Sequence, residues 1–380
     1  MMNSERGVEG AKMDVPYWGL LGGQGLPTVR RARSMGLSTS IRRFNDLAVP
    51  GMGGIWYAKQ PFLAALGVAV AEAARKKNYR VKNIEVANAI EALACWLTRD
   101  TSEGASSGRI RGVTKMPQRG ATSLSFAEVR KPTFYVTQPM RMVSIQPLRM
   151  LGLVDSEAER FNAFSPNAST MELVEAFASA TSLGGRHPRS VVEFLVNKWI
   201  ACPDQGLLGP HQRAMEGLKS LLLLDLPPPV AALELLRQRM TEDTRPGAER
   251  RRGALNWVES LRTSGSRAHI EGCPAHLGEM HWHDMLLGRD FFSLRDASMT
   301  VLEQLERRVS RAGIRRLSLT EISVSGLDAS IENLRAAAHT FLHRLKQGAS
   351  VPDPVAMSLA QECVREEFAS VVLGLVQRDG

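Results

Sequence analysis

The residues with the most ligand-like composition lie between positions 269 and 284, in the string HIEGCPAHLGEMHWHD. Imidazole and thiolate groups are the ligands that zinc prefers in proteins, and three or four of them could converge on one ion. The spacing matches neither a CxxC pair nor an HExxH helix, which leaves a loop with incidental histidines as the alternative. The candidate ligands are Cys273, His276, His281 and His283, with His269, Glu279 and Asp284 nearby.

Signatures of other enzyme classes are missing from the sequence. Neither of the glycine-rich strings LLGGQG and GMGG continues into the Gly-Lys-Ser/Thr of a nucleotide-binding loop. Carboxylates in the C-terminal half fall at helical spacing among arginines, which is typical of exposed helix faces. We therefore expect a non-catalytic protein without a cofactor, and a zinc-containing enzyme is one alternative.

Positive charge is concentrated in the first 150 residues. That segment holds 22 Lys and Arg against 10 Asp and Glu, whereas residues 151–380 hold 26 against 29. Such an asymmetry predicts that the N-terminal part faces a polyanion, nucleic acid above all. A surface matched to an acidic partner protein is the other interpretation.

Two groups of cations are candidate phosphate contacts. Arg42 and Arg43 precede the GMGG string, and Lys59 follows it at the expected start of a helix, where the helix dipole favours an anion. The polar, glycine-rich stretch 100–125 predicts a flexible basic loop. The cations of this loop are Arg109, Arg111, Lys115 and Arg119.

Helices must position most of these residues, because apolar side chains recur at helical spacing through most of the chain. Residues 59–77 and 83–97 predict two helices joined by a basic turn that contains Lys76, Lys77, Arg80 and Lys82, and thus a helical hairpin. Residues 139–151 predict a helix that Pro147 should kink or split. Further helices are expected near 170–181, 189–201, 211–224, 229–241, 248–263, 281–288, 292–312, 328–347 and 354–378.

The segment after residue 151 predicts a small β-hairpin, formed by LGLV, the polar turn DSEAER and the returning strand FNAF. A helix followed by this hairpin resembles the second half of a winged helix-turn-helix domain, over roughly residues 83–180. The resemblance implies that the helix enters the major groove and that the hairpin is the wing. It also implies that Arg141, Ser144 and Arg149 face the groove and that Arg160 lies on the wing.

Two further strings, RRFNDLAVPGMGGIWYAKQ and IEVANAIEALACWL, are similar to uncharacterised proteins of bacterial phage-defence gene clusters. This resemblance implies a subunit that recognises DNA or scaffolds a complex, while a partner supplies ATPase or nuclease activity. The expected function is therefore a non-catalytic nucleic-acid-binding accessory or scaffold subunit. A protein–protein adaptor that does not bind DNA is the main alternative.

The expected fold is mainly α, a helical multi-domain protein with a small winged-helix-like β-hairpin in its N-terminal half. Its expected domains are an irregular basic arm over residues 1–58, a winged-helix-like basic domain over 59–182 and a helical domain over 183–380. No apolar run reaches the roughly 18–20 residues of a membrane span, and acids precede any apolar run at the N-terminus. Together with four scattered cysteines, this predicts a cytoplasmic protein.

Overall fold

The computed structural model describes residues 17–18, 35–55, 57–99, 112, 124–132, 134–136, 138–179, 181, 190–205, 212–266, 272–311, 317–318, 326–347 and 353–379. It is mainly helical, with a two-stranded antiparallel hairpin around residues 155–165, which confirms the expected fold class. The chain forms two compact units, here called unit 1 (Met1–Ala48 with Ile270–Gly380) and unit 2 (Val49–His269). These bounds differ from those of the three expected domains.

A helical hairpin forms the centre of unit 2. Its helices are α2 (Lys59–Lys76) and α3 (Asn83–Arg99), and both are buried along most of their length. The two backbones approach closely at Gly67, where an added Cβ would lie 2.6 Å from the Cβ of Ala87. This contact and the apolar residues around it fix the angle at which the two helices meet, and with it the turn between them.

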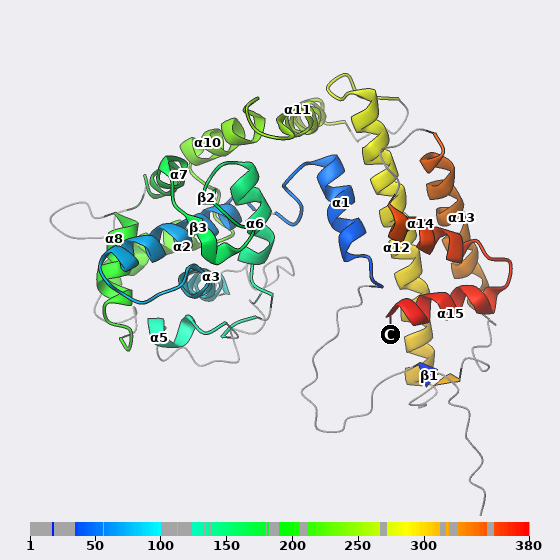
Figure 1. The fold of residues 1–380 in the computed structure, drawn as a ribbon, viewed down its shortest axis with the longest axis horizontal. Coiled ribbons are helices and arrows are strands. Elements are labelled where there is room, and N and C mark those ends of the chain that lie inside the picture. The colour runs from blue at the N-terminus through cyan, green and yellow to red at the C-terminus, as the bar shows by residue number, and fades with distance from the viewer. Residues whose placement is uncertain are drawn as a thin grey trace, which may run out of the picture. The chain divides into compact units, whose positions relative to one another are not determined.

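The next part of unit 2 contains α5 (Phe126–Val129), α6 (Arg141–Met150), the strands β2 (Asp155–Ser156) and β3 (Phe164–Ser165), and α7 (Ala168–Ala178). Pro147 lies inside α6 without dividing it, so the predicted split is wrong. In the hairpin, Asp155 pairs with Ser165 and Ser156 with Phe164. Figure 1 labels both strands close to α2, against which β3 packs.

The hairpin is fastened at both of its ends by asparagine side chains. Asn83, at the start of α3, donates to the carbonyl oxygens of Phe161 and Phe164 at 2.9 and 2.8 Å. Asn167 caps α7 by accepting from the backbone N–H of Thr170 at 3.0 Å, and the Thr170 hydroxyl accepts in return from the Asn167 backbone. The short 3-10 helix η2 (Phe161–Ala163) is thereby held against the start of α3.

Unit 2 is completed by helices that follow one another along the chain. They are α8 (Val191–Leu195), the π-helical segment η3 (Val196–Ile200), α9 (Gln212–Leu222), α10 (Val230–Thr241) and α11 (Ala248–Ser264). Their bounds agree with the predicted helices to within about two residues at most ends. The α7 helix packs on α10, and its Phe177 stacks on Phe62 of α2 with ring centroids 4.2 Å apart.

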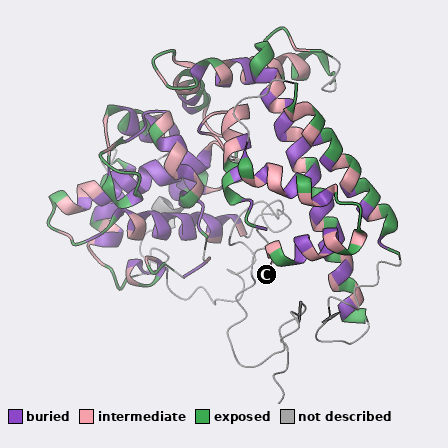
Figure 2. Ribbon diagram, turned by 45° about the vertical axis from the view of Figure 1, so that its right-hand side comes forward, coloured by how far each residue is buried: buried purple, intermediate pink, exposed green. Residues whose placement is uncertain are grey.

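Unit 1 is built around the long helix α12 (Glu279–Arg311), against which α13 (Asp328–Leu345) packs, while α14 (Pro354–Cys363) packs on α13 in turn (Figure 1). The helix α15 (Phe368–Asp379) follows, and β1 (Tyr17–Trp18) pairs with β4 (Leu317–Ser318). Figure 2 shows buried and exposed residues side by side along α12, the pattern of a helix with one face in a core. One helix thus replaces the predicted pair 281–288 and 292–312, and two helices replace the predicted 354–378.

The helix α1 (Ser38–Ala48) also belongs to unit 1, although an irregular arm was predicted there. Its Phe44 is buried and contacts two other rings, at 4.5 Å from Phe291 and 6.1 Å from Phe341 between centroids. Ser40 Oγ donates to Asp353 Oδ1 at 2.7 Å, which joins α1 to the capping residue of α14. The Gly-, Pro- and Ser-rich composition of the surrounding arm therefore concealed a packed helix.

Candidate nucleic-acid interface

The turn between α2 and α3 carries the highest density of positive charge in the described part of unit 2. Residues 75–82 include five cations and no acid. Arg75 closes the turn, because its guanidinium donates to Asn83 Oδ1 at 2.8 Å and to Glu72 at 2.9 Å. The four remaining side chains are exposed: Lys76, Lys77, Arg80 and Lys82.

Contacts from neighbouring elements place two more exposed cations beside this turn. Arg160 directly precedes Phe161, whose carbonyl accepts from Asn83 at the start of α3. Lys131 follows α5, and its carbonyl accepts from Asn88 on α3 at 2.7 Å. These exposed cations belong to the α2–α3 turn or to segments whose backbone contacts the first two turns of α3, and we call the set the basic end. Its members are Lys76, Lys77, Arg80, Lys82, Lys131 and Arg160.

The cations of the basic end differ in how far they are already neutralised. Lys76 lies 3.8 Å from Glu72, and the Lys77 ammonium donates to Asn197 at 2.7 Å. In the described structure the side chains of Arg80, Lys82, Lys131 and Arg160 make neither a hydrogen bond nor an ion pair. Exposed cations without a protein carboxylate are the side chains that can release counterions when a phosphate backbone binds.

Two of the predicted groove-facing residues, Arg141 and Ser144, are buried instead. Arg141 donates to Asn88 Oδ1 at 3.0 Å and lies 3.9 Å from Glu91, and the hydroxyl of Ser144 donates back to the Met140 carbonyl at 3.4 Å. This corrects the expectation that both would lie on the surface. The positive charge of Arg141 compensates a buried acid and is not available to a duplex.

The acid beside Arg141 is Glu91, which is fully buried and accepts few hydrogen bonds from its neighbours. Glu91 accepts from the hydroxyl of Tyr135 at one carboxylate oxygen, whereas its Oε1 has no partner among the described residues. Loss of water around the carboxylate therefore outweighs the Tyr135 and Arg141 contacts and raises the pKa of Glu91 to about 7. Burial likewise raises the pKa of Tyr135 and of Cys95.

Lys59 and Arg149 also have partners within unit 2. The Lys59 ammonium is buried and donates to the carbonyl of Leu223, and burial lowers its pKa to about 8 against the opposing charge of Asp225. The prediction that Lys59 binds an anion at the start of α2 is therefore wrong, because its ammonium group is buried and already bonded. Arg149 of α6 is partly exposed and pairs at 2.6 Å with Glu159, in the turn between β2 and β3. Its positive charge is therefore offset by this acid.

The remaining predicted cations fall elsewhere. Arg42 is exposed on α1 in unit 1, and Arg43 beside it lies 3.9 Å from Asp353. The four loop cations Arg109, Arg111, Lys115 and Arg119 lie outside the described residues. Gly112 from that loop is described, and its backbone lies against the Tyr135 ring, where an added Cβ would approach a ring carbon to 2.4 Å.

The histidine and cysteine candidates are not brought together where the structure describes them. His281 is buried with Nε2 2.7 Å from the Ala48 carbonyl, while Cys273 Sγ lies 3.3 Å from the Leu277 carbonyl. His276 is exposed and His283 is half-buried. Within the described ranges no three His, Cys, Asp or Glu side chains are close enough to hold a metal ion, and His269 lies outside those ranges.

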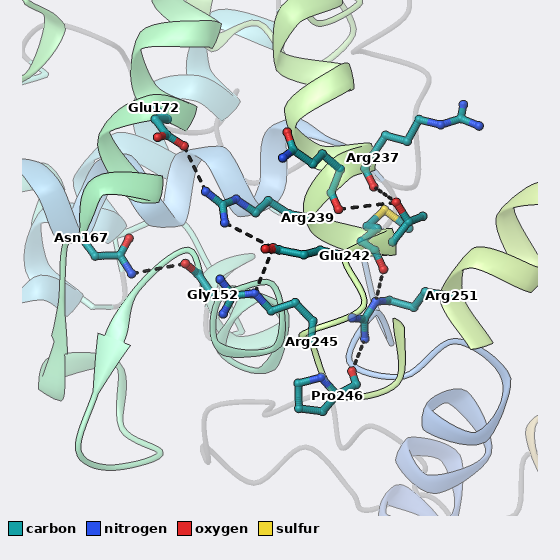
Figure 3. Close-up of polar contacts among 12 residues, drawn as sticks. Gly152, Asn167, Glu172, Arg237, Arg239, Glu242, Arg245, Pro246 and Arg251 are labelled. Carbon is teal, nitrogen blue, oxygen red and sulfur yellow. Dashed lines mark hydrogen bonds and ion pairs between the residues drawn. The ribbon is translucent and has the colours of Figure 1, made fainter. Parts of the chain in front are cut away.

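A second group of cations, around the α10–α11 turn, is internal (Figure 3). Arg239 pairs with Glu172 of α7 at 3.1 Å and with Glu242 at 3.4 Å, and Arg245 pairs with the same Glu242 at 3.3 Å. The Arg245 guanidinium also fills the space beside Gly152, where a Cβ would come within 2.1 Å of it. These arginines tie the turn to α7 and to the end of α6, and their charges are offset by the acids.

Arg251 completes this internal group as a buried donor to backbone carbonyls. Its Nε donates to Met240 at 2.7 Å, and its Nη1 donates to Pro246 at 2.7 Å (Figure 3). The same Nη1 donates to Pro50 at 3.1 Å. The Met240 carbonyl lies in the last turn of α10, where carbonyl oxygens have no N–H donor within the helix. Arg251 therefore stabilises the end of one helix from the start of the next.

The predicted nucleic-acid contacts lay on the N-terminal arm, at the start of α2, in the loop at 100–125, on α6 and on the wing, and of these only Arg160 belongs to the basic end. The string RKKNYRVK holds Lys76, Lys77, Arg80 and Lys82, so its density of cations is a sequence signal for those four residues, whereas Lys131 comes from another segment. Comparisons of the chain with protein-family models, with curated proteins and with solved structures find no match. Among the described residues, no helix has both the length and the apolar character that crossing a membrane requires.

Proposed function

We propose that this protein is a non-catalytic nucleic-acid-binding accessory subunit that contacts the phosphate backbone of DNA through the basic end of unit 2. The observation that supports the proposal most directly is the group of exposed cations without protein partners at the α2–α3 turn and beside it. Because these side chains project from a turn between two closely packed helices, they need little rearrangement to meet a phosphate backbone.

The wider setting of the proposal rests on the resemblance of RRFNDLAVPGMGGIWYAKQ and IEVANAIEALACWL to proteins of phage-defence gene clusters. On that basis the protein would act in the cytoplasm within a bacterial multi-protein system, and a partner would supply ATPase or nuclease activity. The resemblance to winged-helix domains supports a role for the β2–β3 hairpin in DNA contact, because Arg160 of this hairpin belongs to the basic end.

The test is duplex DNA binding across a salt series, measured by electrophoretic mobility or fluorescence anisotropy. Each phosphate contact contributes roughly 0.9 to the slope of log affinity against log salt. The variant R80A/K82A/R160A removes three exposed cations without protein partners, so it should lower the slope by about 2.7 and weaken binding at least tenfold at about 0.15 M salt. An unchanged slope would refute the assignment of the interface.

A matched control is offered by three exposed cations of unit 1, changed in R307A/R311A/K346A. This variant removes the same total charge, so it should leave the slope within about 0.5 of the wild-type value if binding is local to the basic end. Equal losses in both variants would indicate binding through net charge alone. No binding by the wild type at physiological salt would favour the adaptor function, in which the basic end meets an acidic protein.

A further inference from the structure

An apolar groove on unit 2 is unrelated to the basic end. It is lined by residues of α10 and α11 and by Leu151 at the end of α6, and it encloses about 510 Å³. The remaining lining residues are Met52, Ile55, Tyr57, Ala58 and Pro61. Apolar side chains dominate the lining, and the groove follows α10 from Val230 to Met240, a helical rise of about 15 Å. A hollow of this length takes side chains from several turns of a facing helix.

Apolar side chains also project from the walls of this groove into solvent. Val230 is 71% exposed and Leu233 is 44% exposed on α10, and Val258 of α11, beside the lining residue Leu255, is 56% exposed. A small ligand held in the hollow would leave Val258, which is not part of the lining, in water. The same surface thus offers both protruding apolar groups and a hollow to receive such groups, as a self-complementary interface does.

The charges at the rim are self-complementary as well. Two of the four charged lining residues pair with each other, since the Arg237 guanidinium lies 2.7 Å from the Glu259 carboxylate. The other two are Glu234 on α10 and Arg262 on α11, which have opposite signs. Neither lies within ion-pair distance of a partner among the described residues, and the pKa of Glu259 is lowered by its hydrogen bond from Arg237 and further by the charge of Arg262. A two-fold axis over the groove would let Glu234 of each copy meet Arg262 of the other, which forms the same pair twice.

We propose that the groove is a homodimer interface in which α10 and α11 of one copy pack on those of a second copy. The occupant follows from the rim, because its two acids and two bases give no net charge with which to select an acidic or a basic protein, whereas they can pair with the same set on a second copy. Val230 and Leu233 of each copy then fill the hollow of the other. The basic end takes no part in this interface, so the inference does not depend on the proposed function.

The test is the dimer dissociation constant of the full chain, measured by sedimentation equilibrium for the wild type and five variants. E234R and R262E each replace two opposite-charge pairs per dimer with two like-charge pairs, and each should weaken the dimer at least about tenfold. The double variant E234R/R262E restores opposite charges and should return to within about threefold of the wild type. V230D places a charge in the hollow and should give a monomer, whereas E216R, on the exposed face of α9, should not change the constant.

Circular dichroism of each variant checks that the substitutions leave the helical content unchanged. Recovery in the double variant is the result that a folding defect or a small-molecule pocket would not produce. The proposal is overturned by a wild type that stays monomeric at about 0.1 mM, by a dimer that E234R and V230D leave unaffected, or by a double variant as weak as the single variants.

Discussion

Replacing Glu91 with glutamine changes the charge of the most deeply buried acid in unit 2 and keeps its shape. Glu91 is fully buried, accepts from the Tyr135 hydroxyl and lies 3.9 Å from Arg141. The pKa of Glu91 is about 7, raised from an ordinary 4.5 chiefly by burial. Below pH 4.5 the acid is neutral in the folded and the unfolded chain, so E91Q and the wild type should then have similar stability.

The sign and size of the effect follow from proton linkage. Because folding raises this pKa, the folded state holds the proton more tightly, and stability falls as pH rises from 4.5 to about 7. A pKa that moves from 4.5 to about 7 on folding corresponds to about 3 kcal/mol. Above pH 7 the wild type therefore loses this stabilisation in full, whereas glutamine never becomes charged.

The measurement is the free energy of unfolding by urea at several pH values from 4 to 8, for wild type and E91Q. The difference between the two proteins should grow from near zero to about 3 kcal/mol in favour of E91Q. The exposed substitution E128Q controls for titration at the surface and should differ from wild type by less than about 0.5 kcal/mol throughout. Parallel curves for E91Q and the wild type would show that folding does not change the pKa of the Glu91 carboxyl, which contradicts the reasoning.

Two further substitutions test how unit 2 is held together. R251M removes the donor to three backbone carbonyls and should destabilise the protein by about 3–5 kcal/mol in urea unfolding, and a loss below 1 kcal/mol would mean that other donors satisfy those carbonyls. N83A removes the bonds to the Phe161 and Phe164 carbonyls and should cost about 2–4 kcal/mol of stability. It should also weaken DNA binding without any change in net charge, because it frees η2 from α3, and DNA affinity equal to that of the wild type would separate the hairpin from the interface.

Helix existence could be read from the sequence wherever one apolar face repeats at helical spacing. The hairpin α2–α3 and the helices α10 and α11 agree with prediction because their packing follows from their own residues. The long helix α12 was expected to be divided between residues 288 and 292. It continues through Gly288, where the side chain of Phe44 packs at 3.6 Å from the position of a Cβ. That support comes from α1, which local sequence cannot reveal.

The break between α14 and α15 has a similar origin. Arg335 of α13 donates to the carbonyl oxygens of Arg365 and Glu366, and its guanidinium lies 4.4 Å from the centroid of the Phe368 ring. These contacts hold the connection between the end of α14 at Cys363 and the start of α15 at Phe368 against α13. The apolar periodicity of residues 354–378 predicts one helix, because it contains no information about Arg335, which lies on α13.

The candidate site was harder to predict than the fold, because charge counts do not tell which cations are used internally. Arg141 and Lys59 contributed to the basic balance of the first 150 residues, but each is committed to a partner distant in sequence. Lys76, Lys77, Arg80 and Lys82 remain exposed in the α2–α3 turn, and residues 75–82 contain no acid. Pairing of a cation is decided by tertiary contacts, and sequence spacing reports only pairs within one helix.

Unit 1 is assembled from the two ends of the chain, and this imposes an order on folding during synthesis. All of residues 49–269 must be translated after α1 before α12 leaves the ribosome, which takes roughly 10–45 s at 5–20 residues per second. Throughout that interval Phe44 has neither Phe291 nor Phe341 to pack against, so α1 emerges early and waits without its core. Unit 2 is one continuous segment of the chain, so it can fold in that time. Once folded, it replaces a long flexible connection between the two segments of unit 1. The entropy lost when these segments join is then smaller.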